Sequence, residues 1–358
     1  MEHVGYERQV VPEDIGEGAP VNMRRRYATD LFRRFNFRPC PVNEFGVGPW
    51  QMIVSGDAGM ISRQISTDDL RRQDLGRFPL VLQCAGNRRA LMPNPGPGLP
   101  WKNNAVALVE ARGVRASSVI RQDWIPSGLQ FVLVVGADGS GKADDYSRDS
   151  FAQWFTVGDF FKYGWFVTEL MGKPLDLPHG GPVRLVMLHH YGNSHVKQIA
   201  QVVFLREQPT THFKGTKYMV VDPLTEKRVP VGLMLPCSDP MEFYEGGRQV
   251  TGIAYGGEDP VTSVRVRWEG GAWVTALPFV DDTEHGEITA SHLRCTGNYW
   301  RWIARMPKPP VGDNPRLMSC ATTESGLAQP EKYDVVRSGG YLNNTALWWP
   351  AADLVAGA

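Results

Sequence analysis

Three short apolar runs, each followed by a polar loop that contains glycine, constrain the fold of this chain more than any other feature. They lie at residues 78–83, 131–135 and 183–188, and the loops behind them are Cys84-Ala85-Gly86-Asn87, Gly136-Ala137-Asp138-Gly139 and His189-His190-Tyr191-Gly192. Apolar runs of this length that end at glycine are typical of buried strands. Because loops at strand ends often carry function, we expect the three loops to line one site.

The remaining pattern predicts two domains, since 358 residues are too many for one ordinary core. Thr67 is expected to cap a short helix. Polar, proline-rich pieces at residues 206–247 indicate a linker or long surface loops. Alternating residues at 264–268, a turn, a return strand from Trp273 and a further strand at 299–306 then predict an antiparallel β-sandwich.

Composition excludes several classes of protein. Lys plus Arg and Asp plus Glu both number 38, which argues against nucleic acid as a partner. The longest apolar runs are far too short to span a membrane, so we expect no membrane span. The five cysteines are widely spaced without a CxxC or CxxCH motif, so neither a disulfide scaffold nor a c-type haem is expected. No leader peptide is visible, and we predict a cytoplasmic protein.

The segment Gln83-Cys84-Ala85-Gly86-Asn87-Arg88-Arg89 carries the clearest chemical signal. It places a thiol at a strand end beside small residues and two guanidinium groups. Positive neighbours favour the thiolate, which is the form that binds soft metals. A lone cysteine is more often a buried structural residue. The two adjacent arginines make a purely structural role for Cys84 less expected, because they need an anionic partner or solvent.

The motif CAGNRR at Cys84–Arg89 resembles the molybdenum-ligand motif of the sulfite oxidase and assimilatory nitrate reductase family. Residues 179–184 and 191–197 resemble the stretch with which that family anchors its pterin, in outline HGxPxR…GxxxVK. Further similarity lies at residues 101–120, at 251–255 and at 340–344, the last two in the family's dimerisation domain. The resemblance covers most of residues 30–348 in the family's order.

The resemblance implies an α+β chain. A mixed α/β molybdopterin domain of sulfite oxidase type at residues 30–235 would follow an N-terminal arm at 1–29. An immunoglobulin-like antiparallel β-sandwich for dimerisation would occupy 236–350, with a tail at 351–358. The implied cofactor is molybdenum-molybdopterin, whose dithiolene supplies two sulfur ligands.

The same resemblance implies roles for individual residues. Cys84 would be the metal ligand, Arg89 would bind the anion and Trp101 would shape the pocket. The residues implied to hold the cofactor are Asn36, Phe37, Cys84, Asp138, His179, Arg184, His195, Val196 and Lys197. Their chemistry agrees, because Arg184 and Lys197 can neutralise a phosphate and Asp138 can accept hydrogen bonds from amino groups.

The chain departs from the family pattern where the substrate would bind. The family's Arg-Asn-His before a Pro-x-Pro is replaced by Phe35-Asn36-Phe37, and its tyrosine near the metal is absent from residues 150–155. Arg337-Ser338-Gly339-Gly340 stands in place of Asn-x-Arg-Gly. The sequence therefore supports molybdenum binding better than it supports one particular substrate.

The expected activity is oxidation of sulfite to sulfate by oxygen-atom transfer. The expected partners are a small anionic substrate and an external electron acceptor, a cytochrome or a small oxidant, because the chain holds no haem motif. The alternatives are reduction of an oxyanion or S-oxide at the same metal, or an inactive β-sandwich interaction protein. A zinc site built from His179, His189, His190 and His195 lacks the compact spacing of zinc motifs.

We also expect a homodimer held by the sandwich domain. Four tryptophans are candidates either for its surface or for the sandwich core: Trp268, Trp273, Trp348 and Trp349.

Overall fold

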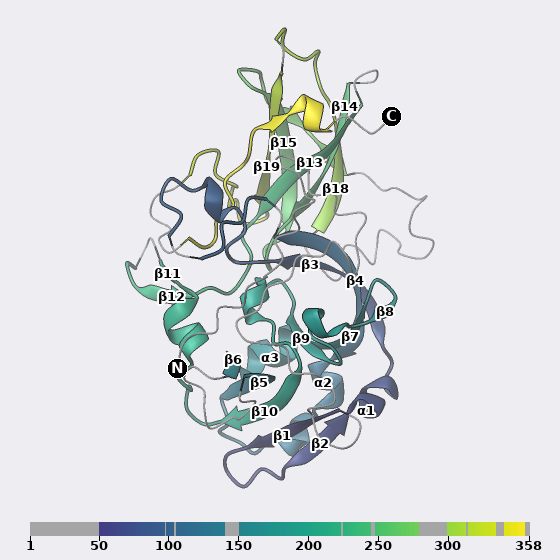
Figure 1. Ribbon diagram of the computed structural model, residues 1–358, viewed down its shortest axis with the longest axis vertical. Coiled ribbons are helices and arrows are strands. Elements are labelled where there is room, and N and C mark those ends of the chain that lie inside the picture. The colour runs from purple at the N-terminus through teal and green to yellow at the C-terminus, as the bar shows by residue number, and fades with distance from the viewer. Residues whose placement is uncertain are drawn as a thin grey trace.

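The computed structural model describes residues 50–354, apart from 97, 104, 140–149, 223–224, 245–247, 279–298, 313 and 334–339 (Figure 1). The described chain is mostly strand with few, short helices, as expected for an α+β protein. Strands from the first part of the chain occupy the lower half of Figure 1, and strands after residue 236 occupy the upper half. The strands β3 and β4 lie where the two halves meet.

Two large sheets form most of the first half as far as its residues are described. One has the order β2-β1-β10-β5-β6 and consists of β1 (Gln51–Gly56), β2 (Arg63–Ser66), β5 (Phe131–Gly139), β6 (Ser150–Thr156) and β10 (Ile199–Leu205). The other has the order β3-β4-β7-β8 and contains β3 (Gly76–Gln83), β4 (Val106–Arg115), β7 (Gly164–Leu170) and β8 (Lys173–Pro174), with β9 (Arg184–Met187) paired to β7. The three strands predicted from apolar runs are β3, β5 and β9, so these predictions are confirmed.

Within the described residues, three short α-helices accompany these sheets: α1 (Thr67–Arg71), α2 (Ala116–Val119) and α3 (Val157–Tyr163). The predicted cap of α1 is wrong by one residue, because Ser66 and not Thr67 is the N-cap. The Ser66 hydroxyl accepts a hydrogen bond from the Asp69 amide at 3.1 Å, and the Asp69 carboxylate accepts one from the Ser66 amide at 2.8 Å. This reciprocal pair is a capping box, which satisfies two backbone donors at once.

The prediction of a linker or long loops at residues 206–247 is wrong for much of that segment. It contains a π-helical turn, Phe213–Lys217, and the hairpin of β11 (Met219–Val221) and β12 (Arg228–Pro230). It also contains β13 (Cys237–Tyr244), a strand of the second half. The polar residues of β13 pair inside the protein, as in the 2.9 Å hydrogen bond between the Ser238 and Ser319 hydroxyls, so their polarity did not indicate exposure.

Two antiparallel sheets form the second half and share one core. The first sheet is β13-β14-β18-β17, with β14 (Gln249–Tyr255), β18 (Tyr299–Arg305) and β17 (Leu277–Pro278). The second is β16-β15-β19-β20, with β16 (Val274–Thr275), β15 (Val261–Trp268), β19 (Arg316–Thr323) and β20 (Trp349–Pro350). The predicted hairpin is the pair β15–β16. Residues 351–354, expected in a tail, form a 3₁₀ turn whose Ala351 and Leu354 are buried in this core.

The four tryptophans divide between core and surface. Trp268 and Trp349 are 2% and 4% exposed and belong to the core between the two sheets, so they are not surface residues. Trp273 and Trp348 are partly buried around a second apolar cluster formed by Met318, Cys320 and Ala346. The guanidinium of Arg267 lies over both rings, at 4.5 and 5.5 Å. Among the described residues, no helix is long and apolar enough to cross a bilayer.

Candidate active site

Cys84 is the first residue after β3, in a segment that is otherwise buried. Its amide donates to the Ala105 carbonyl at 2.9 Å, and its carbonyl accepts from the Asn87 amide at 2.9 Å, which closes a tight turn. Residues 81–83 and 85–89 are buried, whereas Cys84 is partly exposed. A rigid turn therefore presents one accessible thiol.

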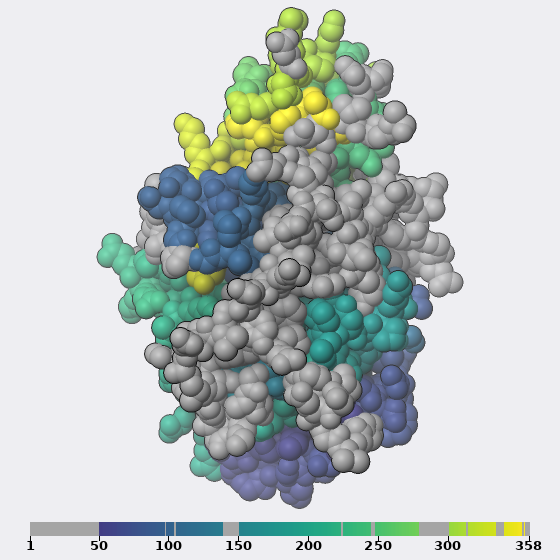
Figure 2. Space-filling model, in the orientation of Figure 1, coloured from purple at the N-terminus to yellow at the C-terminus, as the bar shows by residue number. Residues whose placement is uncertain are grey.

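The segment before β4 supports this turn along its length. The Arg88 amide donates to the Lys102 carbonyl at 2.6 Å, and the Ala90 amide donates to the Trp101 carbonyl at 2.9 Å. Trp101 is 1% exposed, so it forms part of the packed wall beside the turn. Figure 2 shows the segment between β3 and β4, in blue, as a lobe on the surface near the green β11–β12 hairpin.

The loop after β9 approaches the cysteine from another side. A Cβ atom on Gly192 would lie 3.3 Å from the Gln83 carbonyl oxygen, so this loop packs on the residue directly before Cys84. Three residues further along the chain lies His195, which is buried. The predicted meeting of the first and third loops is therefore seen in the structure.

His195 is held as a neutral imidazole. Its Nε2 lies 3.2 Å from the Met187 carbonyl oxygen, to which it can only donate, so its Nδ1 accepts from Nη2 of Arg184 at 3.1 Å. Burial, together with the charge of Arg184, lowers the pKa of His195 well below its ordinary value. Val196 continues this segment and pairs with Leu185 of β9 through two backbone hydrogen bonds of 2.8 and 3.2 Å.

Arg184 is a buried cation whose contacts in the protein are neutral. Nη1 donates to the His179 carbonyl at 3.3 Å, and Nε has no hydrogen-bond partner. Within the described part of the chain, no carboxylate forms an ion pair with Arg184. Burial lowers the pKa of Arg184 to about 10, so it remains charged at neutral pH. Such a group is stabilised by an anion that the protein itself does not supply.

Asp138 lies at the end of β5, beside the same segment. The Ala137 amide donates to the Gln198 carbonyl at 2.8 Å, which aligns this strand end with residues 196–198. A Cβ on Gly136 would lie 2.3 Å from Oδ1 of Asp138, so glycine is needed for the carboxyl group to fold back. Oδ1 is buried without a hydrogen-bond partner, and burial raises the pKa of Asp138 to about 7 despite the charge of Lys197.

Lys197 and His179 complete the cluster. Nζ of Lys197 donates to the Pro178 carbonyl at 2.6 Å, and its chain packs on Gly180, where a Cβ would lie 2.9 Å from Cγ. Nδ1 of His179 lies 2.6 Å from the Asp176 carboxylate, which makes it the donor and leaves Nε2 as the ring's acceptor. Burial is the main cause of the lowered pKa of His179. Asp138, His179, Arg184, His195, Val196 and Lys197 therefore lie close together, and their role in holding a cofactor stays a prediction.

The described contacts of Arg89 are all with residues outside this cluster. Nε donates to the Gly340 carbonyl at 2.9 Å and Nη1 donates to the Leu99 carbonyl at 3.0 Å, while the guanidinium lies 5.0 Å over the Tyr341 ring. Its role in anion binding stays a prediction. Asn36 and Phe37 lie outside the described residues, as does Arg337.

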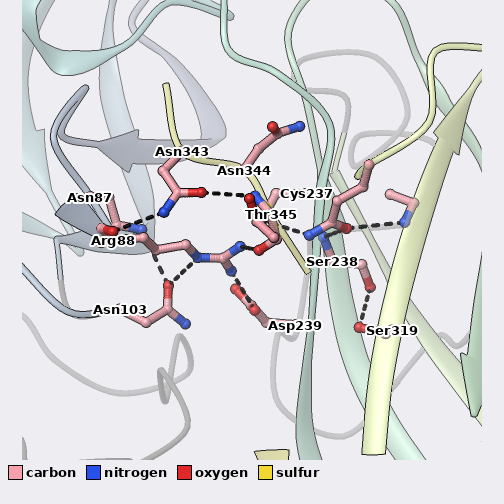
Figure 3. A network of polar contacts seen from close by, with 12 residues as sticks. Asn87, Arg88, Asn103, Cys237, Ser238, Asp239, Ser319, Asn343, Asn344 and Thr345 are labelled. Atoms are coloured by element: carbon pink, nitrogen blue, oxygen red, sulfur yellow. Dashed lines mark hydrogen bonds and ion pairs between the residues drawn. The ribbon is translucent and has the colours of Figure 1, made fainter. Parts of the chain in front are cut away.

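Two residues of the site region have structural contacts for which the sequence predicted no individual role. Gln198 is fully buried with a positive φ of 47°, and its Nε2 donates to the Gly181 carbonyl at 3.2 Å. Arg88 is fully buried and bonds to residues of the second half (Figure 3). Nothing in the sequence distinguishes Gln198, whereas the paired arginines did signal an unmet need for partners. The described residues contain no group of three or more potential metal ligands from His, Cys, Asp and Glu, which disfavours the zinc alternative.

The donor set fits a molybdopterin better than a metal ion alone. Arg184 and Lys197 can neutralise an anionic phosphate, and the buried Oδ1 of Asp138 can accept from an N–H group. The partly exposed thiol of Cys84 is a soft ligand of the kind that molybdenum takes.

Comparisons with known proteins agree with this fit. Residues 39–213 match the family model described as oxidoreductase molybdopterin binding domain. The mitochondrial sulfite oxidase of Homo sapiens is 26% identical over 338 residues, which cover 88% of this chain and 59% of that protein. The NADH nitrate reductase of Solanum lycopersicum is 25% identical over 348 residues, covering 85% of this chain and 36% of that protein. The chain thus spans about 59% of the length of the human relative.

A solved structure shares the fold. The sulfane dehydrogenase SoxCD from Paracoccus pantotrophus superposes with a TM-score of 0.66 at 20% sequence identity, covering 86% of this chain and 76% of that chain.

The buried Asp138 predicts a pH-dependent stability of the cofactor-free protein. Its pKa is raised from 3.8 to about 7, so the folded chain binds a proton that the unfolded chain has lost, and stability falls as pH rises between these values. Asp138→Asn should raise the unfolding free energy above this range by up to a few kcal/mol, at about 1.4 kcal/mol per pKa unit, and change little below it. Urea unfolding on both sides of the range measures this. An equal effect at both pH values would contradict the assignment.

Proposed function

We propose that the chain is a molybdopterin-dependent oxidoreductase of the sulfite oxidase family and that it oxidises sulfite to sulfate; the match of residues 39–213 to a molybdopterin-binding domain and the similarity to sulfite oxidases support this. The overall reaction takes an oxygen atom from water, releases two protons and removes two electrons from the sulfur. A bound molybdenum cofactor supplies the oxygen-atom transfer and accepts those electrons. We propose that they leave to a separate acceptor, a cytochrome or a small oxidant.

The observation that carries the proposal is the buried charge of Arg184, which has no carboxylate partner among the described residues. The loop after β9, which holds its neighbour His195, packs on Gln83, directly before the partly exposed Cys84. Arg184 and Lys197 bind the cofactor's phosphate, the first through paired donors and the second as a point charge. Asp138 accepts from the amino groups of the pterin. His195 is neutral and orients the guanidinium of Arg184 without adding charge. Cys84 supplies the thiolate ligand.

The choice of sulfite rests on the similarity to mitochondrial sulfite oxidases, which extends over 88% of this chain for the human protein. In this proposal Arg89 binds the substrate anion and Trp101 shapes the pocket. Similarity to plant nitrate reductases favours a second candidate, reduction of an oxyanion or S-oxide at the same centre. Steady-state assays with sulfite, nitrate and a sulfoxide separate the two, and a protein purified without molybdenum or pterin would contradict both.

Two further features belong to this proposal. We assign the second half an immunoglobulin-like topology, supported by its two four-stranded antiparallel sheets around one core. We also propose a cytoplasmic location, which rests on the wide spacing of the five cysteines in the sequence.

Replacing the proposed metal ligand tests the centre directly. Cys84→Ser should reduce sulfite oxidation to background while the unfolding midpoint stays near that of the parent protein, because a hydroxyl is a harder and poorer ligand. Cys320→Ala is the control. Cys320 is buried in the second apolar cluster, with Met318 and Ala346, so this variant should retain turnover. Near-normal turnover in Cys84→Ser would remove the central assignment.

Replacing the proposed phosphate anchor should separate binding from stability. Arg184→Met should lower molybdenum and pterin content about 10-fold or more, as loss of a charged hydrogen-bonding partner in a buried site does. The cofactor-free protein should stay within about 1 kcal/mol of the parent, because methionine removes a buried cation that has no carboxylate partner. Arg206→Met, at an exposed position, should leave cofactor content unchanged. Full cofactor content in Arg184→Met would show that the anchor is misassigned.

We also propose a homodimer formed by the second half. Trp273 and Trp348, stacked with Arg267, supply the aromatic and arginine surface that protein interfaces favour. Light scattering at micromolar concentration should give twice the chain mass, and Trp348→Ala should shift it toward the monomer. A monomer mass for the parent protein that does not change on concentration would contradict the dimer.

A further inference from the structure

Arg88 directs its guanidinium to three separate segments of the protein (Figure 3). Nε donates to Oδ1 of Asn103 at 2.8 Å, in the segment before β4. Nη1 donates to the Thr345 carbonyl at 2.7 Å, and Nη2 donates to Oδ1 of Asp239 on β13 at 2.5 Å. The last two acceptors belong to the second half of the molecule, so this side chain reaches from the Cys84 turn into the other domain.

The backbone of Arg88 is fixed as firmly as its side chain. Its amide donates to the Lys102 carbonyl at 2.6 Å, and its carbonyl accepts from Nδ2 of Asn343 at 2.9 Å. Its φ is +64°, a left-handed conformation that non-glycine residues seldom adopt. These five contacts to three segments hold the residue in this conformation, four residues after Cys84.

The ion pair of Arg88 and Asp239 is expected to add little to the free energy of unfolding. Their side chains are 0% and 2% exposed, and removing both charges from water offsets much of their attraction. A planar guanidinium does, however, fix the relative positions of the groups it bonds, which a flexible ammonium group cannot do. The main effect of Arg88 is therefore to fix the positions of Asn103, Thr345 and Asp239 relative to one another.

We propose that Arg88 is a positioning residue that ties the turn carrying Cys84 to the second domain, so that cofactor retention depends on how the two domains dock. This rests on the proposed function, since it takes Cys84 as the metal ligand. A second link follows the same path: the Leu342 amide donates to the Ala85 carbonyl at 2.9 Å. Arg88 and Arg89 thus have different duties, although they are adjacent in the motif.

The test compares Arg88→Lys with the double variant Arg88→Met/Asp239→Leu. Lysine keeps a positive charge for Asp239 but loses the fork that holds Asn103 and Thr345. The double variant removes both buried charges, so it avoids an unpaired carboxylate and remains measurable if the single variant fails to fold. Both should lower cofactor affinity about 10-fold or more, as loss of a residue that supports a metal ligand does.

Labelling of Cys84 provides a readout that stability alone does not move. The rate at which a thiol reagent labels Cys84 in the metal-free, folded protein is measured as the difference from the same protein carrying Cys84→Ser. It should change several-fold in both Arg88 variants. Val266→Ala is the matched control, because it truncates a fully buried core residue of the second domain and lowers stability without touching the Arg88 contacts. It should keep both the cofactor content and the labelling rate of the parent.

The possible outcomes separate the two proposals. Parental labelling and cofactor content in a folded Arg88 variant would overturn the positioning role, as would equal losses in Val266→Ala. Absence of molybdenum and pterin from the parent protein would overturn the proposed function instead. In that case the labelling comparison still decides whether Arg88 positions the turn.

Discussion

The buried ion pair between Arg88 and Asp239 is the interaction on which the rest of the arrangement depends. It joins the turn after β3 to β13, and the same guanidinium also holds Asn103 and Thr345. Isolated buried charges are costly: burial alone lowers the pKa of Arg88, and the charge of Asp239 is the main effect that raises this pKa above its usual value. This buried ion pair therefore joins the two halves of the molecule, and its arginine belongs to the same turn as Cys84.

The candidate site shows a second pattern of buried charge, with the opposite character. Arg184 is surrounded by the carbonyl of His179 and the neutral ring of His195, and Asp138 leaves one oxygen without a hydrogen bond. The guanidinium of Arg88 has the carboxylate of Asp239 as its partner, whereas the guanidinium of Arg184 has no carboxylate partner among the described residues. This contrast distinguishes a structural cation from a binding cation, and it supports the assignment of a phosphate-bearing cofactor.

The proposed cofactor site, which we call the cradle, consists of the cluster from Asp138 to Lys197 described above. It differs from the proposed substrate pocket in its agreement with the family pattern. The cradle residues from 138 to 197 lie together, and the family model covers the same part of the chain. The sequence departs from the family pattern at residues 35–37, 150–155 and 337–340, where the substrate would bind. The anion-binding role of Arg89 also differs from its described contacts, which are with backbone carbonyls of Leu99 and Gly340. The proposed substrate therefore follows from the similarity to sulfite oxidases, and the proposed cofactor site follows from the described contacts.

The sequence by itself determined the local features of this protein. Apolar runs predicted β3, β5 and β9, and the motif at Cys84–Arg89 identified the turn that holds the thiol, because both signals are encoded in neighbouring residues. Only the tertiary structure decided what the two arginines of that motif do. The carboxylate partner of Arg88 lies 151 residues away and a carbonyl partner of Arg89 lies 251 residues away, so each pairing depends on how the two halves of the chain pack. The pattern of neighbouring residues cannot predict such partners. Burial and hydrogen bonding between the two halves arise only when segments distant in the sequence meet.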